Sequence, residues 1–227
     1  GIPRAKTYVI PQPVPQHIAQ GSGGYGRSPL GACRKPIRLL FLAAHYPHKN
    51  HRILPRVVRE IRDRGLADTI HIFVTLGDRA PPALQEALAA CTDVVSDVGC
   101  LHPGSVSDAL TDASALFLPT LVESYGLIYL EAMACGRPIL TSDRDFARWM
   151  CRDVAGYFDP LSERSIVDAI VGLPTLVAET DIRARGTARL RELPLDWQRV
   201  GVRFAEVLGL PLGQTPARPG PMVKPAS

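Results

Sequence analysis

The most constraining feature of the sequence is a regular alternation of short apolar runs with amphipathic segments. Residues 37–44 read IRLLFLAA, a nearly continuous apolar run that is typical of a strand buried on both faces of a sheet. In the next segment, Leu54, Val57 and Ile61 recur at helical spacing, with arginines on the other faces. Gly65 ends that pattern. A buried strand followed by an amphipathic helix predicts a β-α unit.

The same alternation continues to about residue 208. Further strands are expected at residues 69–76, 92–98, 115–118, 138–141 and 157–158. Further helices are expected at residues 81–90, 106–113, 125–134, 165–171, 182–191 and 197–208. This order predicts an α/β fold, a Rossmann-like and mainly parallel sheet with helices on both faces. Ligands of such sheets bind beyond the carboxyl ends of the strands, so the residues that follow each strand are the candidates for a site.

The chain divides into a central domain and two flanks. The apolar residues 8–10 predict a short strand, and the Gly- and Ser-rich run within residues 16–36 predicts a flexible linker. We therefore expect a strand and a linker at residues 1–36 and one domain at residues 37–208. The Pro- and Gly-rich residues 209–227 are expected to form a disordered tail.

Composition narrows the classes of function. The 26 Lys and Arg residues against 22 Asp and Glu residues give a net charge of +4 without a basic block, so nucleic acid is not an expected partner. No apolar run approaches the ~20 residues that span a bilayer. The five cysteines are never arranged as CxxC, which argues against a disulfide framework or a zinc site and favours a reducing, cytoplasmic location.

The most informative segment reads PTLVESYGLIYLEAMACGRP. Glu123 lies in the loop after a predicted strand, and Glu131 lies eight positions later on the next predicted helix. The two carboxylates would therefore address different parts of one ligand rather than act as a close acid/base pair. The backbone N–H groups of about Tyr125, Gly126 and Leu127 are the unpaired donors of a helix start, which binds phosphate well. A glycine in the first turn lets the phosphate approach the chain closely.

This segment resembles the donor-site signature of the retaining GT-B glycosyltransferases of family 4 (glycosyl transferases group 1). That signature has two glutamates separated by seven residues, a helix of small residues, and Gly-x-Pro. Residues 8–14, 43–50 and 142–160 also resemble segments of the family, so the likeness covers roughly residues 1–208. All of it falls in the donor-binding, C-terminal half. We expect this chain to lack the acceptor-binding N-terminal domain and to be inactive without it.

The resemblance implies a role for each matched residue. Glu123 would bind hydroxyls of the transferred sugar and Lys49 would neutralise the departing diphosphate, so these two are the catalytic candidates. Glu131 would bind the nucleotide ribose. The other donor-binding candidates are Ser124; Tyr125, Gly126 and Leu127, whose amides would meet the diphosphate; and Gly99, Cys100 and Leu101, whose backbone would touch the nucleobase.

One departure from the family pattern follows the first predicted strand. The family usually carries Gly-Arg where this chain has Ala43 and Ala44. That arginine is the family's second cationic contact to the diphosphate, and losing a charge-assisted contact costs about 1.5–3 kcal/mol. Either His45 substitutes in part, or Lys49 serves without a second cation.

The resemblance implies a glycosyltransferase of the hexosyltransferase type, which takes its glycosyl unit from a nucleoside-diphosphate sugar with retention and needs neither metal nor another cofactor. The expected partners are the nucleotide sugar and a glycan or lipid-linked acceptor of polysaccharide biosynthesis. We leave open a peripheral association with the inner face of a membrane. Two other functions also stay open: a nucleotide-sugar epimerase of the same fold, and a degenerate, non-catalytic nucleotide-binding or docking module, which Ala44 favours.

Two patterns invite a metal site. His45, His48 and His51 are spaced three apart, but no nearby Cys or carboxylate completes a ligand set. Asp143 and Asp145 resemble the metal-binding Asp-x-Asp of a different glycosyltransferase fold. After a predicted strand, they are expected to cap the following helix instead.

Overall fold

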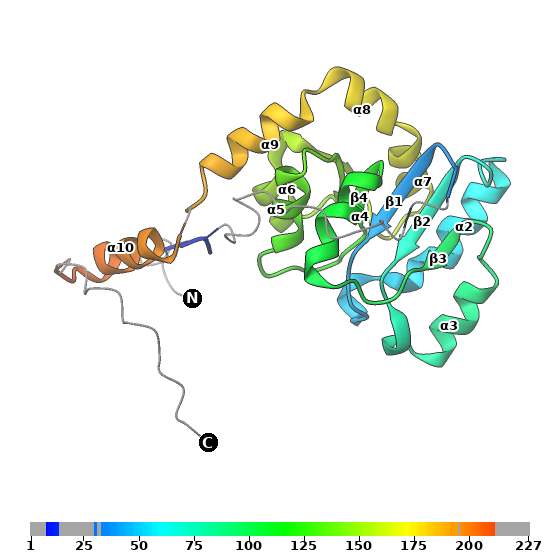
Figure 1. The fold of residues 1–227 in the computed structure, drawn as a ribbon, viewed down its shortest axis with the longest axis horizontal. Coiled ribbons are helices and arrows are strands. Elements are labelled where there is room, and N and C mark those ends of the chain that lie inside the picture. Colours follow the sequence, from blue (N-terminus) through cyan, green and yellow to red (C-terminus); the bar gives the residue numbers. More distant parts are fainter. Residues whose placement is uncertain (1–7, 14–29, 31–32, 195, 212–227) are drawn as a thin grey trace.

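The computed structural model describes residues 8–13, 30, 33–194 and 196–211. Its centre is a six-stranded sheet in the order β3-β2-β1-β4-β5-β6, with every neighbouring pair parallel (Figure 1). The strands are β1 (Ile37–Phe41), β2 (Ile70–Val74), β3 (Val95–Asp97), β4 (Ala115–Leu118), β5 (Ile139–Ser142) and β6 (Ala155–Phe158). The predicted Rossmann-like α/β sheet is confirmed.

Helices connect the strands and cover both faces of the sheet (Figure 1). The helices are α2 (Leu54–Asp63), α3 (Pro82–Ala89), α4 (Val106–Asp112), α5 (Leu127–Ala134), α6 (Asp145–Cys151), α7 (Glu163–Val171), α8 (Leu173–Glu179), α9 (Ile182–Arg191) and α10 (Trp197–Leu208). Short 3-10 turns are η2 (Pro47–Lys49), η3 (His51–Ile53), η4 (Gly77–Arg79), η5 (Pro103–Ser105) and η6 (Arg152–Val154). Helix α2 packs against α3 and α7, whereas α5 packs against α4 and α9. The sequence did not predict α8.

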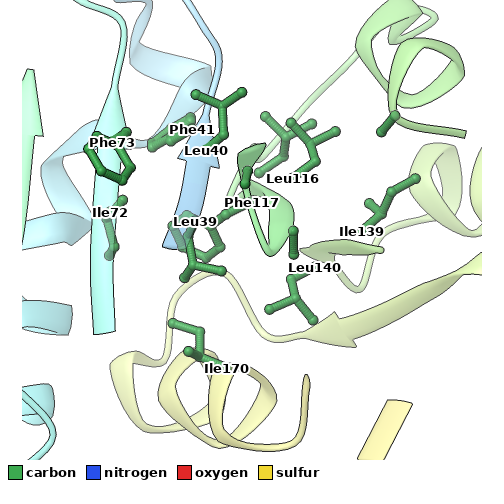
Figure 2. Packing of buried hydrophobic residues seen from close by; sticks show 14 of the residues in the cluster. Leu39, Leu40, Phe41, Ile72, Phe73, Leu116, Phe117, Ile139, Leu140 and Ile170 are labelled. Atoms are coloured by element: carbon green, nitrogen blue, oxygen red, sulfur yellow. The ribbon is translucent and has the colours of Figure 1, made fainter. Parts of the chain in front are cut away.

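The core lies between the sheet and helices α2 to α9. Figure 2 shows Ile170 of α7 pointing toward Leu39 and Leu140 on the sheet, and all three side chains are fully buried. Phe41 meets Phe117 of the neighbouring strand edge to face, with ring centroids 5.8 Å apart. Each large apolar side chain buried in this way contributes about 1.5–3 kcal/mol. The packed sheet therefore holds the loops at its carboxyl edge in fixed positions.

The winding of the chain reverses between β1 and β4. From β1 the chain moves outward through β2 and β3, then returns to the other side of β1 at β4 and moves outward through β5 and β6. The loops that leave β1 and β4 therefore turn to opposite faces and leave a crevice at their carboxyl ends. The candidate residues Lys49 and Glu123 lie in these two loops.

The structure corrects two predicted elements. Residues 8–10 are not a strand, and the prolines at positions 11 and 13 have no N–H to donate to a neighbouring strand. The helix of the donor-site signature begins at Leu127, not at residue 125, because Gly126 adopts a φ of +79°. A left-handed residue cannot belong to a right-handed helix, so Gly126 is the N-cap rather than part of the first turn.

The expected capping role of Asp143 and Asp145 holds only for Asp145, whose Oδ1 accepts from the N–H of Phe146 in the first turn of α6 at 2.8 Å. The carboxylate of Asp143 accepts hydrogen bonds from Nε and Nη2 of Arg148, at 2.6 and 2.8 Å. Arg144 is the N-cap of α6, and its side chain makes no capping hydrogen bond. Asp143 therefore holds Arg148 in a bidentate ion pair and does not cap the helix.

The flanks are described only in part. Residues 1–7, 14–29 and 31–32 of the predicted strand and linker region, and residues 212–227 of the predicted tail, lie outside the described residues. Within the described part of the chain, no helix combines the length and the apolar character needed to cross a membrane.

Candidate active site

The side chains of Lys49 and Glu123 meet at the crevice between β1 and β4. Nζ of Lys49 donates to Oε2 of Glu123 in an ion pair, and the two side chains are 18% and 16% exposed. Burial raises the pKa of the Glu123 carboxyl, but the hydrogen bond and the charge of Lys49 outweigh this and hold the pKa below its usual range. The site therefore holds an ionised carboxylate beside an ammonium at neutral pH.

The loop that carries Lys49 is anchored to its neighbours through main-chain and side-chain hydrogen bonds. The N–H of Leu121 donates to the carbonyl oxygen of His48 at 2.7 Å. Nδ2 of Asn50 donates to the carbonyl oxygens of Pro119 and Pro160, at 3.1 and 2.9 Å. Asn50 is not among the residues predicted for the site, although its place directly after the candidate lysine, as a polar residue, is a signal that could have identified it.

The amino end of α5 lies beside Glu123. A Cβ added at Gly126 would lie 2.5 Å from Cδ2 of Tyr129 and 3.3 Å from Cγ of Glu123, so only glycine fits. No side chain among the described residues caps α5. The N–H of Tyr129 donates to the carbonyl oxygen of Gly126 at 3.0 Å. The first-turn donors that remain for an anion are therefore the N–H groups of Leu127 and Ile128.

The loop between β4 and α5 is also tied to the segment at residues 8–13. The N–H of Ser124 donates to Oε1 of Glu123 at 2.9 Å. The hydroxyl of Tyr125 donates to the carbonyl oxygen of Gln12 at 2.5 Å. A cavity of about 810 Å³ lies between this loop, the segment at residues 8–13 and the start of α6. The cavity is large enough for a sugar-sized ligand to reach Glu123.

The predicted nucleobase contacts lie farther along the same edge of the sheet, after β3. Gly99 adopts a φ of +74°. Asp97, which ends β3, accepts hydrogen bonds from the N–H groups of Leu76, Gly77 and Gly99, at 3.0, 2.9 and 2.9 Å. A cavity of about 570 Å³ lies between these loops and α3. Asp97, which joins the loop after β2 to the loop after β3, is not among the residues predicted for the site.

Cys100 and Leu101 continue the stretch after Gly99. The thiol of Cys100 is exposed and points to the carbonyl oxygen of Leu76, with sulfur and oxygen 3.8 Å apart. Leu101 is partly buried and packs against the hydrophobic core. The stretch is therefore anchored by the two residues that follow Gly99, and its contact with a nucleobase stays a prediction.

Glu131 lies on α5, whereas Glu123 lies in the loop before that helix. Glu131 is half-buried and lies four residues after the first helical residue, which is about 6 Å along the helix axis. This placement agrees with different tasks for the two glutamates, and the ribose contact of Glu131 stays a prediction.

The three histidines of the β1 loop do not form a metal centre. His51 is 1% exposed and stacks on Phe41, with ring centroids 4.2 Å apart. Burial, and next the neighbouring His45, lower the pKa of His51 to about 4. His48 instead stacks on the exposed Tyr46. Across the described residues, no group of three or more His, Cys, Asp or Glu side chains could hold a metal ion.

Residues 36–175 match the family described as glycosyl transferases group 1. The matched range spans β1 to α8 and contains Lys49, Asp97, Glu123 and Glu131. It therefore includes every part of the candidate site except the segment at residues 8–13.

Curated relatives share the same name. A D-inositol 3-phosphate glycosyltransferase from Actinosynnema mirum is 32% identical over 149 residues, which are 61% of this chain and 36% of the relative. A protein of the same name from Geodermatophilus obscurus is 24% identical over 97% of this chain and 52% of the relative. The chain thus spans about half or less of the length of these two relatives.

Solved structures share the fold. OtsA matches with a TM-score of 0.68 and 11% identity, over 88% of this chain and 51% of that chain. TarM matches with a TM-score of 0.64 and 11% identity, over 82% and 36%. Sucrose-phosphate synthase from Thermosynechococcus elongatus matches with a TM-score of 0.61 and 17% identity, over 88% and 49%. At these identities the likeness concerns the fold alone, which is the GT-B glycosyltransferase fold.

Proposed function

This chain belongs to the glycosyl transferases group 1 family, and we propose that it binds a nucleoside-diphosphate sugar as the donor half of a retaining glycosyltransferase. The observation that carries the proposal is the Lys49–Glu123 pair beside the uncapped amino end of α5. A diphosphate bound there meets an ammonium and the amide donors of the helix start.

In this proposal, Lys49 and the amino end of α5 stabilise the leaving diphosphate. When the bond between the anomeric carbon and the diphosphate oxygen breaks, negative charge grows on the leaving diphosphate. The compact ammonium of Lys49 and the positive end of the α5 dipole stabilise that charge. Fixed charges of this kind act without a metal ion, so we propose that none is required.

Glu123 binds the transferred sugar in this proposal. Its carboxylate is ionised because Lys49 lowers its pKa, so it accepts hydrogen bonds from hydroxyl groups of the transferred sugar. The adjoining cavity of about 810 Å³ gives the sugar its place. The nucleobase then lies along the sheet edge near Gly99 and Asp97, and Glu131 accepts from the ribose hydroxyls.

We propose that the acceptor is bound by a part of the protein outside this chain. The chain spans 36% of one curated relative and 52% of another, and its site residues serve the donor. The shared name of these relatives makes D-inositol 3-phosphate the first acceptor to test, beside glycan and lipid-linked acceptors.

Calorimetric titration with UDP, GDP and ADP and with their sugar conjugates tests donor binding. We expect one nucleotide class to bind, and Glu131→Ala to weaken that binding. Glu179→Ala, which removes an exposed carboxylate at the end of α8, is the matched control and should bind like the wild type. If no nucleotide binds, the proposal fails and a docking module is favoured.

Ala44 favours a second candidate function, a module that binds nucleotide but performs no transfer. The complete protein, supplied with the bound nucleotide sugar and an acceptor, distinguishes the two. A glycoside that keeps the anomeric configuration of the donor, read from proton coupling constants, supports retaining transfer. Free epimerised sugar without any glycoside would instead support the epimerase alternative.

A further inference from the structure

We propose that Asn50 is the positioning residue for the Lys49 ammonium, an inference that rests on the proposed diphosphate site. Asn50 follows Lys49 directly, and it is 2% exposed. A buried polar side chain so close to a charged group needs an explanation, because burying an amide is unfavourable unless its hydrogen bonds are made.

The donor capacity of the Asn50 amide is fully used. Nδ2 carries two hydrogens, and its two bonds run to carbonyl oxygens of different segments. One acceptor is Pro119, directly after β4, and the other is Pro160, after β6. A single side chain in the loop after β1 thus ties that loop to the loops that follow two other strands.

The backbone of Asn50 fixes the direction of the chain at the same point. Its φ of 63° and ψ of 31° are left-handed, and Asn50 lies between turns η2 and η3. Its N–H donates to the carbonyl oxygen of Pro47 at 3.2 Å, and its own carbonyl oxygen accepts from Ile53 at 3.0 Å. Asparagine tolerates this conformation better than most residues and also supplies the two donors, whereas glycine meets only the first need.

Both members of the ion pair depend on this anchor. Lys49 is the residue before Asn50, and Glu123 lies four residues after the Pro119 carbonyl that Asn50 holds. Asn50 therefore sets the separation between the ammonium and the carboxylate without touching a ligand itself.

Two variants of Asn50 separate its side-chain bonds from its backbone shape. Asn50→Gly keeps the left-handed conformation and removes both donors. Asn50→Asp also permits the left-handed backbone conformation, but its carboxylate cannot donate to the carbonyl oxygens of Pro119 and Pro160. We therefore expect Asn50→Asp to weaken diphosphate binding more than Asn50→Gly does. Ser114→Ala is the matched control, since Oγ of Ser114 accepts from the N–H of Arg38 at 3.0 Å, at the amino edge of the same sheet.

The readout compares UDP, GDP and ADP with their nucleosides by calorimetry. We expect Asn50→Gly to weaken binding of the preferred nucleoside diphosphate about tenfold, while the nucleoside binds as before. Ser114→Ala should leave both affinities unchanged. In the Lys49→Ala background, Asn50→Gly should cause no further loss, because the group that it positions is gone.

Equal losses for nucleoside and diphosphate, or additive losses in the double variant, would overturn the positioning role. The N–H of Leu121 donates to the carbonyl oxygen of His48, so its hydrogen-exchange rate reports how firmly the Lys49 loop is held. This rate tests the role of Asn50 independently of whether any nucleotide binds. If no nucleotide binds the wild type, the proposed function fails, and faster exchange at Leu121 in Asn50→Gly alone still supports the anchor. If exchange at Leu121 did not change in Asn50→Gly, the anchoring role of Asn50 would be contradicted, whether or not a nucleotide binds.

Discussion

The ammonium of Lys49 and the carboxylate of Glu123, 74 residues apart in the sequence, form an ion pair across the crevice between β1 and β4. Both side chains are largely buried, so water and salt screen this pair less than a pair at the surface. Because each residue leaves a different strand, the pair exists only when the two loops are correctly placed.

Lys49→Ala should weaken binding of nucleoside diphosphates by about tenfold or more, because a charge-assisted contact is lost. Binding of the corresponding nucleoside should not change. Calorimetry measures both. Arg56→Ala, which breaks the surface ion pair with Glu163, is the control and should bind like the wild type. Equal weakening of nucleoside and diphosphate would place Lys49 away from the phosphates.

Gly126→Ala should destabilise the fold by about 2–4 kcal/mol, since it combines a strained left-handed residue with a clash in a packed region. The added Cβ would lie 2.5 Å from Cδ2 of Tyr129. Gly201→Ala is the matched control, because the added Cβ has no atom within 4 Å and lies within α10. This control should be neutral or stabilising by up to about 1 kcal/mol. Urea unfolding measures both, and similar results for the two variants would refute the requirement for glycine.

Asp97→Ala should weaken binding of the nucleoside and of the diphosphate to the same extent. The carboxylate of Asp97 joins the loops after β2 and β3, and its loss leaves three N–H groups without an acceptor. Calorimetry distinguishes this pattern from that of Lys49→Ala, which spares the nucleoside. If Asp97→Ala weakened binding of the diphosphate alone, the nucleobase would not bind at these loops.

His51 should make the stability of the protein depend on pH in mild acid. Burial lowers its pKa from 6.5 to about 4, so the unfolded chain takes up a proton in a range where the folded chain does not. The free energy of unfolding should therefore fall by about 3 kcal/mol between pH 6.5 and pH 4. Denaturant unfolding across that range measures the slope. His51→Phe should flatten the slope and the exposed His48→Gln should keep it, and an unchanged slope in His51→Phe would refute the assignment.

The sheet was predictable because parallel strands buried on both faces leave uninterrupted apolar runs. The run at residues 37–44 contains β1, and the spacing of Leu54, Val57 and Ile61 marks α2. The apolar residues 8–10 carry the same local signal, but the prolines that follow cannot support a ladder of hydrogen bonds. Local pattern therefore identifies a strand only where its neighbours can pair with it.

The candidate site was predictable only in part. Lys49 and Glu123 stand out by their place after predicted strands and by the signature around them. Asn50 and Asp97 do not, because their partners are backbone groups 69 and 20 residues away. The exact start of α5 was equally hidden, since it depends on the backbone angle of Gly126.

The central claim is that a diphosphate binds the amino end of α5 beside the Lys49–Glu123 ion pair, on the side of the Lys49 ammonium. Amide chemical shifts of the uniformly ¹⁵N-labelled chain, followed during titration with UDP, GDP and ADP and with the three nucleosides, test it most directly. The account predicts that the amides of residues 124–127 shift with the preferred nucleoside diphosphate and stay in place with its nucleoside. Saturable shifts elsewhere that leave residues 124–127 unmoved would contradict it.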